Sequence, residues 1–151
     1  DAFIEGTTKE GLKKPYVVYL KNKVRPFSFA GIWDEWKDEQ AGKTILSFSI
    51  ITTTANALLQ KLPHHRSPVI LSQSDELRWL NPGTPLTYIT QMLRPYNAEL
   101  MNAYPIDSKI SHPRASGREL IDPAGPPLTP DAHFQVGEHI EKRGFGRRKI
   151  R

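Results

Sequence analysis

A histidine and an arginine stand two residues apart, just before a short apolar run. His64 and Arg66 precede the segment Val69-Ile70-Leu71. Because an extended backbone sends alternate side chains to one face, both can face the same cavity. Imidazole titrates near neutral pH, and the guanidinium fork matches phosphate geometry. The pattern predicts a proton-transfer group beside a phosphate contact; a polar loop before a buried strand is the alternative.

A carboxylate near the start of the chain is a possible partner for this histidine. Glu5 directly follows the apolar pair Phe3-Ile4. A carboxylate at the mouth of an apolar strand can have a raised pKa and act as an acid or base near neutral pH. Glu5 and His64 are therefore the candidate catalytic residues. The alternative for Glu5 is an ordinary solvent-facing or capping carboxylate.

Other side chains suit the binding of a single-stranded nucleic acid. Trp33 and Trp36 offer flat faces on which unpaired bases can stack, although core packing explains aromatic residues equally well. Thr53 lies in a run of three threonines at a predicted strand-to-helix turn, where hydroxyl and backbone N–H groups can bind phosphate. Plain N-capping is the alternative for Thr53.

The sequence predicts neither a metal site nor a bound cofactor. His64 and His65 are adjacent and diverge from an extended backbone, and the other three histidines lack ligand spacing. There is no glycine-rich phosphate loop and no G-x-S-x-G motif, which excludes the common nucleotide-binding and hydrolase sites.

Length and composition indicate one domain that does not span a membrane. The chain has 151 residues, 38% of them hydrophobic, and no apolar run approaches the roughly 18 residues that a bilayer requires. It contains no cysteine, so thiolate chemistry cannot come from these residues. The net charge of +5 favours a polyanionic partner, but six of the basic residues lie in 131–151. Because Ala2 to Ile4 is already strand-like, we expect residues before Asp1.

The hydrophobic pattern predicts a mixed α/β fold with antiparallel strands. A polar hairpin loop is expected at 37–43, and the apolar stripe Leu86, Ile89 and Leu93 is expected to pack in the core. Proline and glycine become frequent after Pro105, which predicts a domain over 1–123 and a basic tail over 124–151. Strands are predicted at 16–20, 27–33, 44–51 and 69–71, and helices at 54–61, at 74–80 and from Thr84 onward.

Four ordered segments resemble the SOS response-associated peptidase (SRAP) family. They are residues 1–5 (DAFIE), 29–36 (FAGIWDEW), 49–56 (SIITTTAN) and 64–71 (HHRSPVIL), and the segments 104–108 and 119–123 resemble the family's C-terminal portion. Together they cover about residues 1 to 123. The resemblance implies a curved, mainly antiparallel sheet closing toward a barrel, with short peripheral helices.

The resemblance also implies a bacterial cytoplasmic protein, expected to be a monomer, that binds single-stranded DNA and crosslinks covalently to abasic sites. The family's nucleophile is an N-terminal cysteine that forms a thiazolidine with the sugar aldehyde, and a self-processing peptidase activity is proposed for the intact chain. Glu5 and His64 match the family's catalytic residues, with His65 as an alternative to His64. Arg66 and Thr53 would hold flanking phosphates, without metal or cofactor.

Two positions depart from the family pattern. Gly6 follows Glu5 where a tryptophan is expected, and Ser67 replaces a methionine. By itself this chain is expected to be inactive in crosslinking. A non-catalytic module that binds single-stranded nucleic acid remains the main alternative, and a small-substrate hydrolase using Glu5 and His64 is a weaker one.

Overall fold

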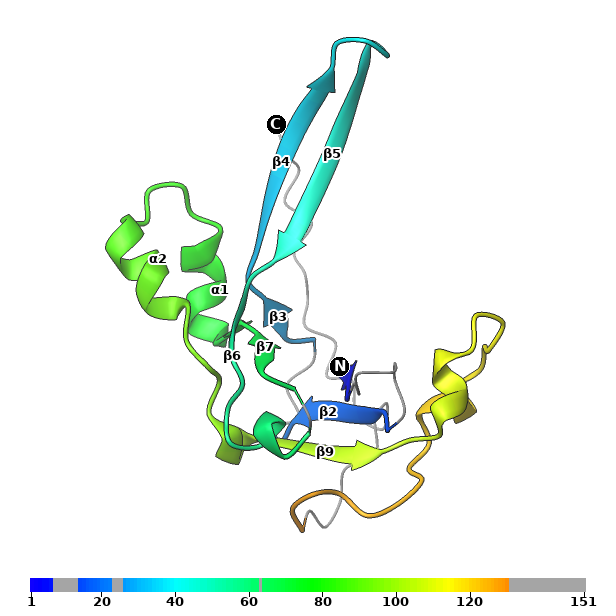
Figure 1. Cartoon of the computed structure of the whole chain (residues 1–151). Helices are drawn as coiled ribbons and strands as arrows, with labels where there is room; N and C mark the ends of the chain where they lie inside the picture. The colour runs from blue at the N-terminus through cyan, green and yellow to red at the C-terminus, as the bar shows by residue number, and fades with distance from the viewer. Residues whose placement is uncertain (7–13, 23–25, 63, 131–151) are drawn as a thin grey trace. The chain divides into compact units, whose positions relative to one another are not determined.

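The computed structural model describes residues 1–6, 14–22, 26–62 and 64–130 (Figure 1). The chain divides into two compact units. The terminal unit comprises residues 1–26 and 100–151, and the central unit comprises residues 27–99. The predicted basic tail at 131–151 lies outside the described residues.

A three-stranded antiparallel sheet forms the terminal unit. Its strands are β1 (Ala2–Glu5), β2 (Tyr16–Leu20) and β9 (Met101–Pro105), in the order β1-β2-β9. Four successive residues of β2, Val17 to Leu20, are buried, as expected for a central strand covered on both faces. Val17 and Tyr19 pack with Tyr104 and Ile106 in the core of this unit.

The segment after β9 turns back onto this sheet. It passes through two short 3-10 helices, η3 (Ser108–Ser111) and η4 (Arg118–Ile121). Leu128 then donates its backbone N–H to Ala103 at 2.8 Å. The fully buried Asn102 side chain donates to the Thr129 carbonyl at 2.9 Å and accepts from the Thr129 N–H at 3.2 Å. We call these two bonds the Asn102 clasp; they tie residues 124–130 to β9.

Three two-stranded antiparallel sheets form the strand part of the central unit. β3 (Ser28–Phe29) pairs with β8 (Ile70–Leu71), β4 (Gly31–Asp38) with β5 (Lys43–Ile50), and β6 (Thr52–Thr54) with β7 (Arg66–Pro68). The helices of this unit are α1 (Gln73–Trp79) and α2 (Leu86–Met92), with the 3-10 helices η1 (Leu59–Lys61) and η2 (Ala98–Leu100, which ends at the unit boundary).

Three single residues separate these strands and hydrogen-bond to one another. Ala30 donates its N–H to Val69 at 2.8 Å, Val69 donates to Ile51 at 2.9 Å, and Ile51 donates to Ala30 at 2.9 Å. Ala30 and Val69 are fully buried, and both belong to a core cluster with Leu71 and Met92. Each strand therefore changes its partner at this closed ring of backbone bonds.

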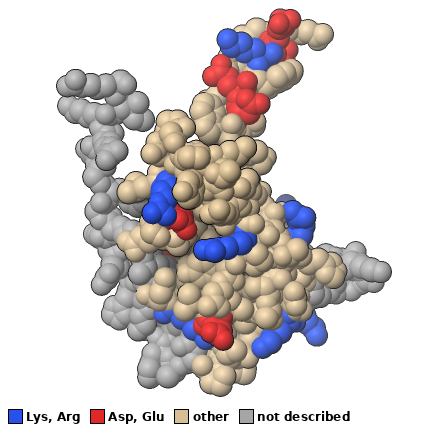
Figure 2. Space-filling view, turned by 90° about the vertical axis from the view of Figure 1, so that its left-hand side faces the viewer, with Lys and Arg blue, Asp and Glu red and all other residues tan. Residues whose placement is uncertain are grey.

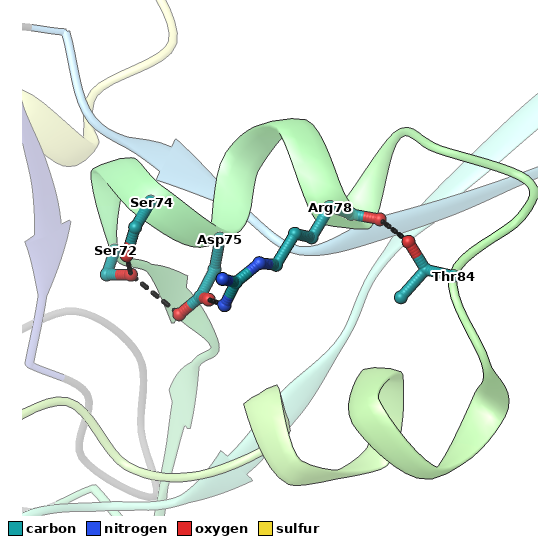
Figure 3. Close-up of polar contacts among 5 residues, drawn as sticks. All are labelled: Ser72, Ser74, Asp75, Arg78 and Thr84. Carbon is teal, nitrogen blue, oxygen red and sulfur yellow. Dashed lines mark hydrogen bonds and ion pairs between the residues drawn. The ribbon is translucent and has the colours of Figure 1, made fainter.

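Side-chain hydrogen bonds fix the start of α1 and the loop that follows it (Figure 3). The Ser72 hydroxyl donates to the Asp75 carboxylate at 2.6 Å, and the Arg78 guanidinium lies 3.6 Å from the same carboxylate. The Thr84 hydroxyl donates to the Arg78 carbonyl at 2.7 Å. Serine before the first turn and aspartate within it are the residues that stabilise a helix N-terminus.

The predicted fold class is confirmed: the protein is mixed α/β with antiparallel sheets. The arrangement of the strands differs from the prediction. Within the described ranges the strands form four separate small sheets, and no closed barrel is present among them. The predicted strand 27–33 is divided at Ala30, and β4 continues through Trp36 to Asp38.

Two helix predictions were wrong in detail. The helix predicted from Thr54 to Lys61 is a strand followed by a turn and the single 3-10 turn η1, because Asn56 accepts the N–H groups of Leu58 and Leu59 at 3.2 and 3.0 Å. In α2, the Leu86 side chain is 73% exposed rather than in the core.

Candidate functional site

The strands β6 and β7 carry two of the predicted site residues, Thr53 and Arg66. In their register Thr54 lies opposite Arg66, Thr53 opposite Ser67, and Thr52 opposite Pro68. Since side chains alternate along a strand and directly opposite residues share a face, Arg66 and Thr53 lie on opposite faces. Ser67 is buried and Arg66 is exposed. The structure thus does not bring Arg66 and Thr53 together on one surface.

The Arg66 guanidinium is held by the neighbouring strand. Its Nε donates to the Thr52 hydroxyl at 2.7 Å, and one terminal nitrogen donates to the Thr52 carbonyl at 3.0 Å. Guanidinium has five N–H donors in a rigid fork, and these two bonds set its orientation on the exposed face. An oriented guanidinium loses less entropy when it binds an anion.

His64 lies just before β7 and is half-buried. Its Nδ1 is 2.6 Å from the carbonyl oxygen of Arg66. Because a carbonyl can only accept a hydrogen bond, Nδ1 carries the proton, and in the neutral ring Nε2 is the basic nitrogen. The neighbouring His65 is exposed, and its carbonyl accepts the Ala55 N–H at 3.1 Å. His64 therefore has a fixed tautomer suited to accepting a proton.

Glu5 ends β1 in the terminal unit, whereas His64 and Arg66 lie in the central unit. It is half-buried, lies opposite Tyr16, and accepts the Gly6 N–H at 3.1 Å. A cavity of about 360 Å³ beside β1 is lined by Asp1 to Ile4, Val17 and Ile121, and it does not include Glu5. The predicted pairing of Glu5 with His64 stays a prediction.

Gly6 has a backbone conformation that a tryptophan would not tolerate. Its φ is +114°, and a Cβ at this position would lie 2.3 Å from the Lys14 carbonyl oxygen. The glycine that replaces the expected tryptophan after Glu5 is therefore required by the local backbone.

Trp33 lies on the β4–β5 hairpin, opposite Phe48. The two side chains are 75% and 78% exposed. The hairpin extends away from the rest of the central unit (Figure 1). Charged side chains gather toward its tip (Figure 2), where carboxylates outnumber lysines.

Two residues that the sequence patterns did not single out, Thr52 and the turn residue Asn56, make side-chain contacts near the site. Antiparallel pairing of 52–54 with 66–68 would have placed Thr52 on the Arg66 face, but the threonine run was assigned to a turn. The Asn56 side-chain amide also donates to the Tyr96 carbonyl at 2.8 Å. The two residues are 40 positions apart, so no local sequence pattern predicts this contact.

The part of the chain that the structure describes holds neither a candidate metal site nor a candidate membrane-spanning helix. No three His, Cys, Asp or Glu side chains there are grouped so that they could hold a metal ion. None of the described helices has the length and apolar character needed to cross a membrane.

Comparison with known proteins defines the class. The family model described as SOS response associated peptidase (SRAP) matches residues 1–113. An X-ray structure of a protein from Bacteroides thetaiotaomicron aligns with a TM-score of 0.73 and 35% identity, over 82% of this chain and 53% of that one. The chain therefore belongs to the SRAP family and has an SRAP-like fold.

Several relatives have names that state a role. The abasic site processing protein YoqW of Bacillus subtilis is 37% identical over 111 residues, which are 73% of this chain and 48% of YoqW. YoaM of the same organism, also called an abasic site processing protein, is 36% identical over 81% of this chain and 53% of its own length. The abasic site processing protein HMCES of Gallus gallus is 27% identical over 82% of this chain and 41% of its own length. The chain thus spans about half the length of these relatives.

Proposed function

We propose that this chain contributes to the processing of abasic sites in single-stranded DNA. Membership of the SRAP family and the names of its relatives support the substrate class. The observation that carries the proposal is the arrangement at β7, where an oriented, exposed guanidinium lies two residues from a histidine with a fixed tautomer. A strand phosphate next to the lesion would bind Arg66, and His64 would lie close to the sugar.

The proposed chemistry is condensation of an amine and a thiol with the sugar aldehyde. The amine adds to the aldehyde, loss of one water gives an imine, and addition of the thiol closes a thiazolidine. His64 Nε2 would accept and return the protons of these steps, and Glu5 would deprotonate or orient the amine. The 151 residues contain no cysteine, so the nucleophile must come from polypeptide outside them. The proposed peptidase activity would belong to the same intact polypeptide.

The covalent step is tested in the polypeptide that carries its native N-terminus. We expect Glu5→Gln and His64→Gln each to slow formation of a heat-stable adduct with abasic single-stranded DNA by about 100-fold, the lower range for general acid–base catalysis. Denaturing gels measure the rate. The exposed residues Glu99 and His65 provide the controls Glu99→Gln and His65→Gln, which should leave the rate unchanged.

The outcomes separate the alternatives. A slow His65→Gln variant with a normal His64→Gln variant would move the proton-transfer role to His65. An adduct that forms at the normal rate in all variants would overturn both catalytic assignments. Binding to single-stranded DNA without any adduct would favour the non-catalytic module.

The phosphate contact is tested by DNA binding. We expect Arg66→Gln to weaken binding of abasic single-stranded DNA. The steepness of log K against log salt concentration should also fall by about 0.7, the value for one phosphate contact on a single strand. Fluorescence anisotropy between about 50 and 200 mM salt measures both. Arg94, exposed in the same unit, gives the control Arg94→Gln. Equal salt slopes in the two variants would show that Arg66 makes no phosphate contact.

Thr53 and Trp33 remain predictions as DNA contacts. Thr53 lies on the face of β6 opposite to that of Arg66, so any phosphate it binds would differ from the one at Arg66. Trp33 has an exposed ring that could stack on a base, but the carboxylates of its hairpin would repel the strand backbone.

A further inference from the structure

One face of the β4–β5 hairpin carries a group of adjoining apolar side chains. Trp33 lies opposite Phe48, and Leu46 lies opposite Glu35. Directly opposite side chains on one face of an antiparallel pair are about 5 Å apart, so these residues adjoin. We call this surface the Trp33 face. By the register and the alternation of side chains, it consists of Gly31, Trp33, Glu35 and Lys37 from β4 with Thr44, Leu46, Phe48 and Ile50 from β5.

The Trp33 face is strongly exposed to solvent. The exposed fractions are 75% for Trp33, 78% for Phe48, 69% for Leu46 and 48% for Ile50. Large contiguous apolar patches on a soluble protein mark interaction sites. In the described part of the chain, β4 and β5 pair with each other and with no further strand. A lone two-stranded hairpin is marginally stable in water, so this one needs a covering partner.

Charge decides against a nucleic acid as that partner. Between residues 31 and 50 the hairpin carries the carboxylates of Asp34, Glu35, Asp38 and Glu39 and only the two lysines Lys37 and Lys43. On the Trp33 face itself one carboxylate and one ammonium group are present. A surface for the phosphate backbone would need an excess of cations along its length.

We propose that the Trp33 face docks a strand-forming polypeptide segment with an apolar face, and that the part of an SRAP polypeptide that this chain does not match supplies it. Length supports this occupant, since the chain spans 48% of YoqW and 53% of the Bacteroides protein of known structure. An added strand would pair with a hairpin edge while its apolar side chains cover Trp33 and Phe48. This inference is independent of the proposed DNA chemistry.

The experiment is complementation between polypeptides. The full chain is co-expressed, in separate trials, with the part of YoqW and the part of YoaM that it does not match, and the complex is purified and measured by titration calorimetry. We expect a 1:1 complex in which the amide hydrogens of β4 and β5 exchange at least tenfold more slowly than in the chain alone. Tryptophan fluorescence should shift to the blue as Trp33 leaves water.

Matched variants locate the contact. Leu46→Ser with Phe48→Ser should weaken the complex at least tenfold. Leu77 and Leu80 are 74% and 76% exposed at α1, and Leu77→Ser with Leu80→Ser should leave the affinity unchanged. Because all four side chains are exposed, neither pair of changes removes a core contact of the chain alone.

Three results would overturn the proposal. The first is no complex with either fragment; the second is a complex that the Leu46 and Phe48 changes do not weaken. The third is protection of β4 and β5 by another occupant, either a second copy of the chain at rising concentration or single-stranded DNA. DNA binding by the Arg66 surface is measured separately, so failure here leaves the proposed function standing.

Discussion

The chemistry proposed for β7 depends on the direction of single side chains. His64 and Arg66 were predicted from their spacing alone to face one cavity. The structure adds that the ring of His64 is bonded to the Arg66 carbonyl and that the guanidinium is bonded to Thr52. Spacing identified the right residue types. It did not identify their hydrogen-bond partners: the ring of His64 bonds to a backbone carbonyl two residues on, and the guanidinium of Arg66 bonds to a residue of another strand, fourteen positions earlier.

Among the residues that the structure describes, Tyr104 has a pKa that the fold clearly raises. Its hydroxyl donates to the Ile121 carbonyl at 3.0 Å. Burial, together with the nearby Asp122 carboxylate, raises the pKa of Tyr104 from 10.0 to about 12. The folded state therefore favours the protonated phenol. This stabilisation is complete below the unfolded pKa and is lost as the pH rises from about 10 to about 12.

We predict that Tyr104→Phe lowers the free energy of unfolding by about 1 kcal/mol below pH 10, the usual contribution of one hydrogen bond. The difference between the natural chain and the variant should narrow between pH 10 and 12, because only the natural chain loses the Tyr104 contribution. Urea unfolding of both proteins at stepped pH measures this difference. A difference that stays constant over the whole range would show that Tyr104 does not titrate as described.

At the scale of elements, the connections determine where the strands end. Gly6 follows β1 with φ +114°, and Gly42 lies in the β4–β5 turn with φ +63°. Both conformations are unfavourable for residues with a Cβ. They differ in surroundings: a Cβ at Gly6 would meet the Lys14 carbonyl at 2.3 Å, whereas a Cβ at Gly42 has nothing within 4 Å.

We predict that Gly6→Ala lowers the free energy of unfolding by about 3 kcal/mol, from backbone strain together with the steric clash. The matched change Gly42→Ala should cost about 1 kcal/mol, from strain alone. Denaturant unfolding of the two variants provides the comparison. Equal costs at the two positions would mean that Gly6 and the Lys14 carbonyl can shift apart to accept the methyl group.

The sequence predicted long strands and α-helices better than their interruptions. The pattern over 16–20, 44–51 and 74–80 predicted β2, β5 and α1 to within one or two residues. It failed at Ala30, where the division of a strand depends on backbone bonds to Val69 and Ile51, both distant in sequence. Residues 54–61 contain good helix formers, yet pairing with β7 and the Asn56 side chain outweigh that propensity.

For the whole molecule, the placement of charge is the feature that bears on DNA affinity. Six basic and three acidic residues lie in 131–151, so the remaining 130 residues carry only about two of the five net positive charges. General attraction to a polyanion is therefore predicted to come mainly from this segment, and a specific phosphate contact from Arg66. Two predictions concern residues that are distant in sequence: the domain boundary near 123 and the proximity of Glu5 to His64. Local sequence patterns do not encode such placement.

We predict that a chain ending at Pro130 binds intact single-stranded DNA more weakly and with a smaller salt slope than the full chain. The slope should fall by about 0.7 for each phosphate contact that is lost. Anisotropy titrations at several salt concentrations measure it. In the shortened chain, Arg66→Gln should lower the salt slope by a further, similar amount. A salt slope that the deletion leaves unchanged would show that residues 1–130 make the phosphate contacts.

The Asn102 clasp limits where this protein can be shortened. The Asn102 side chain has no exposed surface, and a chain cut after residue 123 would lack the Thr129 backbone groups that satisfy its amide. A buried polar group that loses its hydrogen bonds costs about 1 to 3 kcal/mol of stability. Anyone who trims the chain for crystallisation, or fuses a tag to it, should keep everything up to Pro130, since a shorter product would be a damaged domain and a misleading standard for every measurement made with it.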